Sequence, residues 1–225
     1  MVNKEAIADT PKIKRALLSA YKPERVIPLA EGLLRMDVEL WATGGTRKAL
    51  EEKGIKARGT DELTEIVSWF GGRVKTLTPE LFGGILAPRT PEGLAEIKEH
   101  GITTFDVVAV DLYPFEETLK TPGATFQQIL EKIDVGGPSM LRAAAKNHRY
   151  CLPMSSPAAE RWIVLASMDE FKGYVPLGVR MSLAASVFQK TTDYDRAIEG
   201  WLNDVIKDKM EESRRDARRK AKPET

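Results

Sequence analysis

Residues 43–46 read Thr-Gly-Gly-Thr and combine hydroxyl side chains with paired glycines. Backbone N–H groups of paired glycines can approach an anion closely, because no Cβ atom stands in the way. We expect Thr46 to begin a helix, whose N-terminus carries partial positive charge and would favour a phosphate group. A plain strand-to-helix turn would use the same residues, so this segment alone leaves both interpretations open.

A second glycine-rich segment, residues 71–75, adds two cations. Arg73 and Lys75 are two residues apart, so they would point to one face of an extended segment. A guanidinium beside an ammonium group suits a phosphate monoester together with a polar base. An exposed pair of cations without a function is the alternative that this segment leaves open.

A third glycine pair, residues 136–137, follows Asp134 and precedes a predicted helix over residues 139–147. Asp134 would cap that helix, or the glycines would admit a ligand beside its carboxylate. Arg142 and Lys146 are four residues apart and share one face of the helix. The three alanines between them predict close packing and a partly buried Lys146, which would make this lysine a candidate for acid–base chemistry; a solvated helix face is the alternative.

Alternating strand and helix patterns must position these segments. The sequence predicts strands over residues 15–20, 38–42, 105–112 and 149–152, and helices over residues 24–35, 46–53, 124–132, 139–147, 157–168 and 181–206. This order predicts an α/β fold with a parallel sheet, in which ligands bind beyond the carboxyl ends of the strands. The residues that follow the first three strands are Ser19, Ala20, Tyr21 and Lys22, then Thr43, Gly44, Gly45 and Thr46, then Asp111, Leu112 and Tyr113.

Composition excludes several classes of protein. The chain has 225 residues, with 34 Lys and Arg against 33 Asp and Glu, so no basic field points to nucleic acid. No stretch of about 18 apolar residues predicts a membrane span, and the first residues lack the apolar core of a signal peptide. With one cysteine and two histidines, we expect no internal disulfide and no metal site built on Cys or His. We therefore expect a soluble cytosolic protein.

The end of the chain, from Lys207, is highly charged and nearly without apolar residues. It predicts a solvated, frayed helix end or a disordered tail, and a weak phosphate- or partner-binding role is the alternative. We expect one domain over residues 1–206, with a core sheet over about 15–155 and a helical part over about 157–206, followed by a charged tail over 207–225.

Six segments occur in a fixed order: SAYK, ATGGT, GGRVKTL, DLYPF, IDVGGPSMLRAAAKN and AASVFQKTTDYDRAI. Together they resemble the inosine monophosphate (IMP) cyclohydrolase domain of the bifunctional purine-synthesis enzyme that also carries a folate-dependent transformylase. The resemblance runs from about Arg15 to about Leu202. It implies a methylglyoxal-synthase-like parallel sheet flanked by helices, with additional C-terminal helices.

The resemblance also implies a reaction. The carboxamide nitrogen of 5-formamidoimidazole-4-carboxamide ribonucleotide (FAICAR) would attack the formyl carbon, and water would leave to give IMP. No cofactor or metal is implied, and the expected assembly is a homodimer. The implied catalytic residues are Lys75, Tyr113, Asp134 and Lys146, and the implied substrate-binding residues are Ser19, Tyr21, Lys22, Thr43, Gly44, Gly45, Thr46, Arg73, Thr76, Asp111, Gly136 and Gly137.

The sequence departs from the family's pattern at several positions. Thr78 and Phe82 stand where the family usually carries histidine, and Asp111 stands where it usually carries asparagine. The first loop reads SAYKPER, with Pro23 at the usual place of a lysine. Because the chain ends at Thr225, we expect formyl transfer to be done by another polypeptide. Rival interpretations are a methylglyoxal-synthase-like lyase and a non-catalytic nucleotide sensor.

Overall fold

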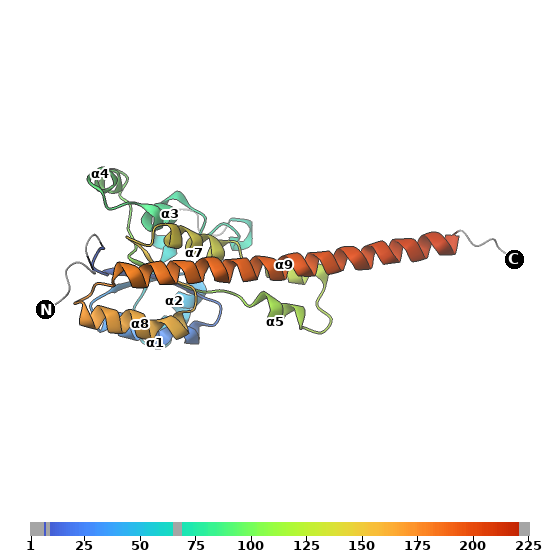
Figure 1. Cartoon of the computed structure of the whole chain (residues 1–225), viewed down its shortest axis with the longest axis horizontal. Coiled ribbons are helices and arrows are strands. Elements are labelled where there is room, and N and C mark those ends of the chain that lie inside the picture. The colour runs from blue at the N-terminus through green and yellow to red at the C-terminus, as the bar shows by residue number, and fades with distance from the viewer. Residues whose placement is uncertain (1–6, 8–9, 65–68, 221–225) are drawn as a thin grey trace. The chain divides into compact units, whose positions relative to one another are not determined.

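The computed structural model describes residue 7 and residues 10–64 and 69–220 (Figure 1). These residues form two compact units. The first unit comprises the described residues up to Tyr113 together with Asp134–Lys190. The second comprises Pro114–Ile133 and the described residues from Thr191.

A parallel five-stranded sheet forms the centre of the first unit. Its strand order is β3-β2-β1-β4-β5, so β1 is paired with β2 on one side and with β4 on the other. The expected α/β class and parallel sheet are confirmed. The strands are β1 (Arg15–Ala20), β2 (Glu39–Ala42), β3 (Arg58–Gly59), β4 (Val107–Asp111) and β5 (Leu152–Met154).

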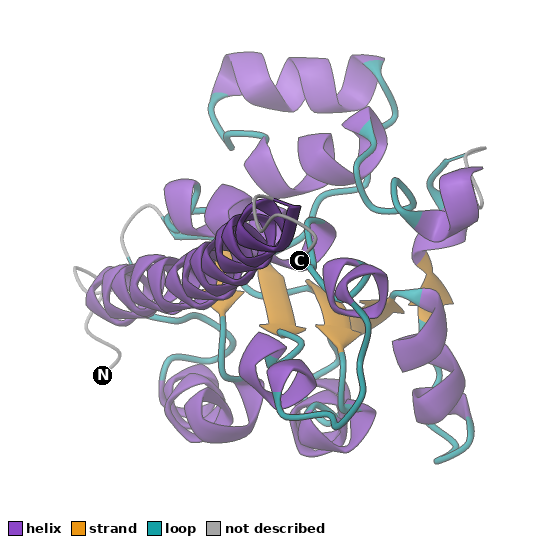
Figure 2. Cartoon of the chain, turned by 90° about the vertical axis from the view of Figure 1, so that its right-hand side faces the viewer, coloured by secondary structure: helices purple, strands orange, loops and turns teal. Residues whose placement is uncertain are grey.

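Helices cover both faces of this sheet (Figure 2). On one face α1 (Ile27–Leu34) packs against α8 (Pro157–Glu170), and on the other α3 (Pro79–Leu86) packs against α7 (Gly136–Lys146). The remaining helices of this unit are α2 (Gly44–Glu51), α4 (Pro91–Glu99), the start of α9 (Leu177–Lys220), and short 3-10 helices at Pro23–Arg25, Thr60–Glu62 and Trp69–Gly72.

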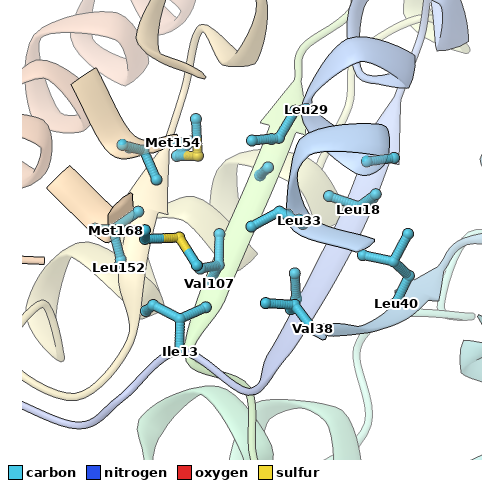
Figure 3. Packing of buried hydrophobic residues seen from close by; sticks show 14 of the residues in the cluster. Ile13, Leu18, Leu29, Leu33, Val38, Leu40, Val107, Leu152, Met154 and Met168 are labelled. Atoms are coloured by element: carbon cyan, nitrogen blue, oxygen red, sulfur yellow. The ribbon is translucent and has the colours of Figure 1, made fainter. Parts of the chain in front are cut away.

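Alternation along the strands divides the core between the two faces. Leu18 and Val107 belong to the cluster that packs against Leu29 and Leu33 of α1 (Figure 3). The preceding residue of β1, Leu17, is fully buried on the opposite face. Full burial of such a side chain stabilises the fold by about 1.5–3 kcal/mol, so both faces of the sheet contribute to stability.

The second unit is helical and holds together through aromatic side chains. It contains α5 (Phe115–Leu119), α6 (Phe126–Leu130) and the part of α9 that begins at Thr191. The Trp201 ring stacks on Phe126, with centroids 5.1 Å apart, and meets Phe115 edge to face at 5.7 Å. The side chains of residues 207–215 are exposed along α9, so this segment is a solvated helix and not a disordered tail.

Several predicted boundaries are wrong. Helix α2 begins at Gly44, two residues before Thr46, and the last strand is Leu152–Met154 and not residues 149–152. Helix α9 begins earlier than predicted and continues to Lys220. Within residues 10–64 and 69–220, no helix is both long and apolar enough to span a bilayer.

Candidate active site

The strand order places a topological switch point between β1 and β4. The chain leaves β1 toward β2 on one side and leaves β4 toward β5 on the other, so the two loops diverge. Ligands of open α/β sheets bind in the crevice at such a point. Ala20 is in register with Asp111, and the Tyr21 N–H donates to the Asp111 carbonyl at 3.0 Å. The first and third predicted site segments therefore meet at this edge.

An ion pair fixes the two loops to each other. Arg25 Nη1 donates to Asp111 Oδ1 at 3.1 Å, and the Lys22 N–H donates to Asp111 Oδ2 at 3.3 Å. The Asp111 side chain is only 10% exposed, so its charge is compensated inside the site. This accounts for the carboxylate at a position where the family usually has an amide. Arg25 was not identified from the sequence, because its partner lies 86 residues away.

Two tyrosine rings from the loops after β1 and β4 are in contact at this edge of the sheet. The Tyr21 and Tyr113 centroids are 4.1 Å apart, with an interplanar angle of 72°. This edge-to-face contact joins the loop after β1 to the loop after β4. Tyr113 is half-buried, whereas Tyr21 is exposed.

The Thr-Gly-Gly-Thr segment forms the start of α2. Thr43 precedes the helix, and its hydroxyl donates to Ser19 Oγ at 3.1 Å, while Thr46 Oγ1 accepts the Ala20 N–H at 2.8 Å. Thr46 is therefore a buried contact between α2 and β1 and not the helix's first residue. The amides of the first turn have no acceptor within the helix.

Open space lies above that helix end. Gly44 and Gly45 are exposed, and a Cβ atom at either would meet no atom within 4 Å. A phosphate group would fit there against the backbone N–H groups. The structure is thus compatible with the anion-binding interpretation of this turn.

The cationic segment is a turn and not an extended strand. Phe70 and Gly71 have φ values of 52° and 67°, and the Lys75 N–H points back to the Gly72 carbonyl at 3.4 Å. The expectation that Arg73 and Lys75 share a face of an extended segment is therefore wrong, because positive φ at consecutive residues reverses the chain. Both side chains are exposed.

The turn is anchored to the start of α7. Thr76 is buried, and a Cβ atom at position 136 would overlap its Oγ1. Gly136 therefore lets the segment that carries Lys75 approach the segment that carries Asp134. Glycine at this position has a packing role, whatever ligand binds nearby.

Asp134 lies just before α7. Its Oδ1 accepts the Gly137 N–H at 3.0 Å, and a Cβ atom at Gly137 would overlap the same carboxylate and lie 2.9 Å from Leu112 Cδ2. The carboxylate is half-buried beside the positive end of the helix, which stabilises its negative charge. Asp134 thus satisfies one N–H of the first turn, although Val135 and not Asp134 is the N-cap residue, and its carboxylate lies next to the loop after β4.

Lys146 lies at the other end of α7. Ten residues separate it from Gly136, a rise of about 15 Å along a helix. The following Asn147 donates to the Ile85 carbonyl at 2.8 Å, at the far end of α3. Lys146 is exposed, so the expected partial burial is wrong, although the alanines before it are buried. Within one chain, Lys146 is not brought to the edge where Asp134 lies.

The two positions that lack the usual histidine have other roles. Thr78 is 3% exposed and caps α3, where its Oγ1 accepts the Leu81 N–H at 3.3 Å. Phe82 is half-buried one turn later. Thr78 therefore supports the helix that follows the cationic turn.

Comparison with known proteins shows the family. The MGS-like domain matches residues 25–139, and the family described as AICARFT/IMPCHase bienzyme matches residues 144–223. The chain belongs to the MGS-like domain family. The predicted resemblance to the cyclohydrolase region of the bifunctional purine enzyme is confirmed by these matches.

Individual relatives of this MGS-like chain agree with the assignment. It is 42% identical over 201 residues to bifunctional purine biosynthesis protein PurH of Halalkalibacterium halodurans and 41% identical over 201 residues to PurH of Bacillus subtilis strain 168. Each alignment covers 89% of this chain and 39% of the relative, so the chain spans well under half of these proteins. The crystal structure of ForH superposes with a TM-score of 0.72 at 36% identity, covering 83% of this chain and 97% of ForH.

Proposed function

We propose that this chain is an IMP cyclohydrolase that closes FAICAR to IMP and water. The observation that carries this assignment is the arrangement at one sheet edge. The carboxyl edge of the sheet carries the open N-terminus of α2, the loops after β1 and β4, and Asp134 at the start of α7. The chain that presents this edge is similar to PurH. The cationic turn is joined to that edge through Thr76 and Gly136.

The phosphate end of the substrate fits the start of α2. Backbone N–H groups there point away from the helix, and Gly44 and Gly45 leave room for phosphate oxygens. Ser19 and Thr43 hydroxyls lie beside this space. Arg73, on the turn that contacts the start of α7 through Thr76, is our candidate for the guanidinium that meets the phosphate monoester or its ribose.

The chemistry of ring closure suits the residues beside α7. The carboxamide nitrogen is a weak nucleophile, and the Asp134 carboxylate accepts its N–H as the new C–N bond forms. The formyl oxygen gains negative charge, and Lys75 and Tyr113 donate to it. The carbon–oxygen bond then breaks, and the oxygen leaves as water with two protons, one from the carboxamide nitrogen and one from the formamide N–H, whose nitrogen forms the ring C=N bond. One such donor contributes roughly 3–4 kcal/mol to barrier lowering.

The remaining roles rest on resemblance. Lys146 is implicated by its motif, but it lies about 15 Å along α7 from the start of that helix, so we assign the reacting centre to Asp134, Lys75 and Tyr113.

A homodimer is part of the same proposal. Exposed apolar side chains on α8 and α9, including Trp162 at 69% and Met181 at 54%, support an interface there, and light scattering after gel filtration measures it.

The decisive experiment is turnover of FAICAR. Purified protein is incubated with FAICAR and IMP is quantified by chromatography, with Asp134→Asn as the matched variant, since asparagine keeps the shape and one acceptor oxygen. We expect IMP from the natural sequence and little from the variant, while both keep the same circular dichroism. A folded protein that makes no IMP, or that releases methylglyoxal from dihydroxyacetone phosphate, would overturn the assignment.

A further inference from the structure

The amino edge of the sheet carries a cavity of about 510 Å³ in the first unit. Arg15 begins β1, and Asp106 directly precedes β4, so the cavity lies at the edge opposite the candidate active site. Lys12, Lys14, Arg89 and other residues complete its walls. Its volume lies within the range of about 300–1,000 Å³ typical of small-molecule sites.

The residues that line this cavity carry an excess of positive charge. Four of its lining residues are cations, whereas Asp106 is the one carboxylate among the described lining residues. Asp106 is 5% exposed, and its Oδ2 accepts the backbone N–H groups of Lys14 and Arg15 at 2.8 and 2.9 Å. The other oxygen, Oδ1, lies 3.5 Å from Arg89 Nη2, so this carboxylate pairs with Arg89 and not with the ammonium groups of Lys12 and Lys14.

Arg15 is already occupied, whereas the lysines are not. The Arg15 guanidinium donates to Glu39 at 3.0 Å and to the Thr104 carbonyl at 3.0 Å. Lys12 and Lys14 are exposed, and neither ammonium group has an ion pair with any residue whose placement the structure describes. Both are available to a ligand that enters the cavity.

Arg89 is the least exposed of the four cations that line the cavity. Its side chain is 14% exposed, and Nη2 lies 3.5 Å from Asp106 Oδ1 and 3.4 Å from the Phe105 carbonyl. Nη1 is buried, and within the described part of the chain no acceptor meets it. A buried donor without an acceptor destabilises a folded protein, and such groups in native structures call for a water, an ion or a ligand.

The opposite wall of the cavity is held in place by backbone contacts. The Ile13 N–H donates to the Gly173 carbonyl at 2.9 Å, and Gly173 has a φ of 93°. The aliphatic part of Lys12 lies against Gly173, where a Cβ atom would overlap its Cε at 2.6 Å. Tyr174 follows and also lines the cavity.

We propose that this cavity is a binding site for a small anion that carries phosphate groups, separate from the catalytic edge. Arg89 and the two lysines are the groups that bind phosphate oxygens by charge-assisted hydrogen bonds. The site goes beyond ring closure, because none of its residues belongs to the carboxyl edge. Its ligand neutralises the lysine pair beside Arg89.

Inorganic pyrophosphate is a suitable probe, and hydrogen exchange reports where it binds. We expect saturable protection of peptides that cover residues 10–15, 87–90 and 103–106, in addition to any protection of residues 43–47 at the catalytic edge. Lys14→Ala removes an exposed side chain but keeps the backbone N–H that Asp106 accepts, so this variant should fold. Lys53→Ala, an exposed lysine in the turn after α2, is the matched control.

Measuring hydrogen-exchange protection as a function of pyrophosphate concentration then tests the site. Lys14→Ala and Lys12→Ala should each weaken pyrophosphate binding at the amino edge by about tenfold, the effect of losing one charge-assisted contact, whereas Lys53→Ala should not. Protection confined to residues 43–47 would overturn the proposal. Equal binding at the amino edge by Lys14→Ala and Lys53→Ala would overturn it too. Neither result depends on whether FAICAR is the substrate.

Discussion

A Cβ atom at position 136 would overlap the Thr76 hydroxyl oxygen, so Gly136 is what allows the cationic turn to lie against the start of α7. In the proposed reaction Lys75 and Asp134 act on two groups of one substrate, and this contact sets their separation. The relative placement of the two segments therefore depends on a glycine that itself performs no chemistry.

Gly136→Ala should therefore displace the turn and lower kcat/KM for FAICAR. A misplacement of about 1 Å between reacting groups costs on the order of 100-fold in rate. Steady-state kinetics measures the effect, and the thermal midpoint shows whether the fold survives. Gly178→Ala is the control, since that glycine lies in α9 with nothing within 4 Å of its Cβ position. A Gly136→Ala enzyme as active as the control would contradict the role of this contact.

The general architecture was predictable from the sequence because it depends on local patterns. Short apolar runs predicted β1, β2 and β4, and the position of glycines and hydroxyls after the strands predicted the carboxyl edge. The Arg25–Asp111 pair was not predictable, because it depends on β4 lying beside β1. Which strands are neighbours depends on the strand order of the sheet, and residue spacing in the sequence does not predict that order.

Two local errors have physical causes as well. Arg73 and Lys75 were expected on an extended segment, but left-handed backbone at Phe70 and Gly71 turns the chain there. Lys146 was expected to be partly buried because buried alanines precede it, but the next helix position points to solvent. The first error depended on backbone dihedral angles that composition does not determine, and the second on the rotation of about 100° per helical residue, which directs Lys146 away from the buried alanines.

Substitution of Gly45 separates folding from ligand binding. A Cβ atom at this position meets nothing in the free protein, so Gly45→Ala should keep or raise stability by about 0.5–1 kcal/mol through better helix propensity. If phosphate binds the first turn of α2, the same methyl group should raise KM roughly tenfold, equivalent to about 1.4 kcal/mol. Urea unfolding and kinetics on one preparation measure both. An unchanged KM would place the phosphate elsewhere.

The Arg25–Asp111 pair can be tested by charge rescue. Arg25→Ala leaves a carboxylate that is 10% exposed without its cation near the proposed phosphate. Repulsion between like charges should then raise KM by a factor on the order of 10. Adding Asp111→Asn to Arg25→Ala removes that repulsion and should restore most of the affinity. If the double variant keeps the raised KM, Arg25 does not act by neutralising Asp111.

The reactivity of Cys151, the residue before β5, tests how well the core is packed there, independently of catalysis. It is the single cysteine of the sequence and is fully buried, and burial raises the pKa of its thiol to about 12. Because the thiolate is the reactive form, the folded protein should not react with a disulfide reagent at pH 8, whereas urea-unfolded protein should react fully. Rapid labelling of one thiol per chain in native buffer would contradict this packing.

Arg73 and Lys75 occupy the same turn, so their substitutions distinguish binding from chemistry. A phosphate or ribose contact is similar in the ground and transition states, and Arg73→Ala should act mainly on KM. Lys75 donates to an oxygen whose charge develops only during ring closure, and Lys75→Ala should lower kcat by about 100- to 1000-fold. Both side chains are exposed, so neither change should disturb the fold, and circular dichroism checks this. If Lys75→Ala keeps near-native kcat while Asp134→Asn loses it, the donor to the formyl oxygen is another group. If Arg73→Ala lowers kcat alone, the substrate lies reversed along the turn.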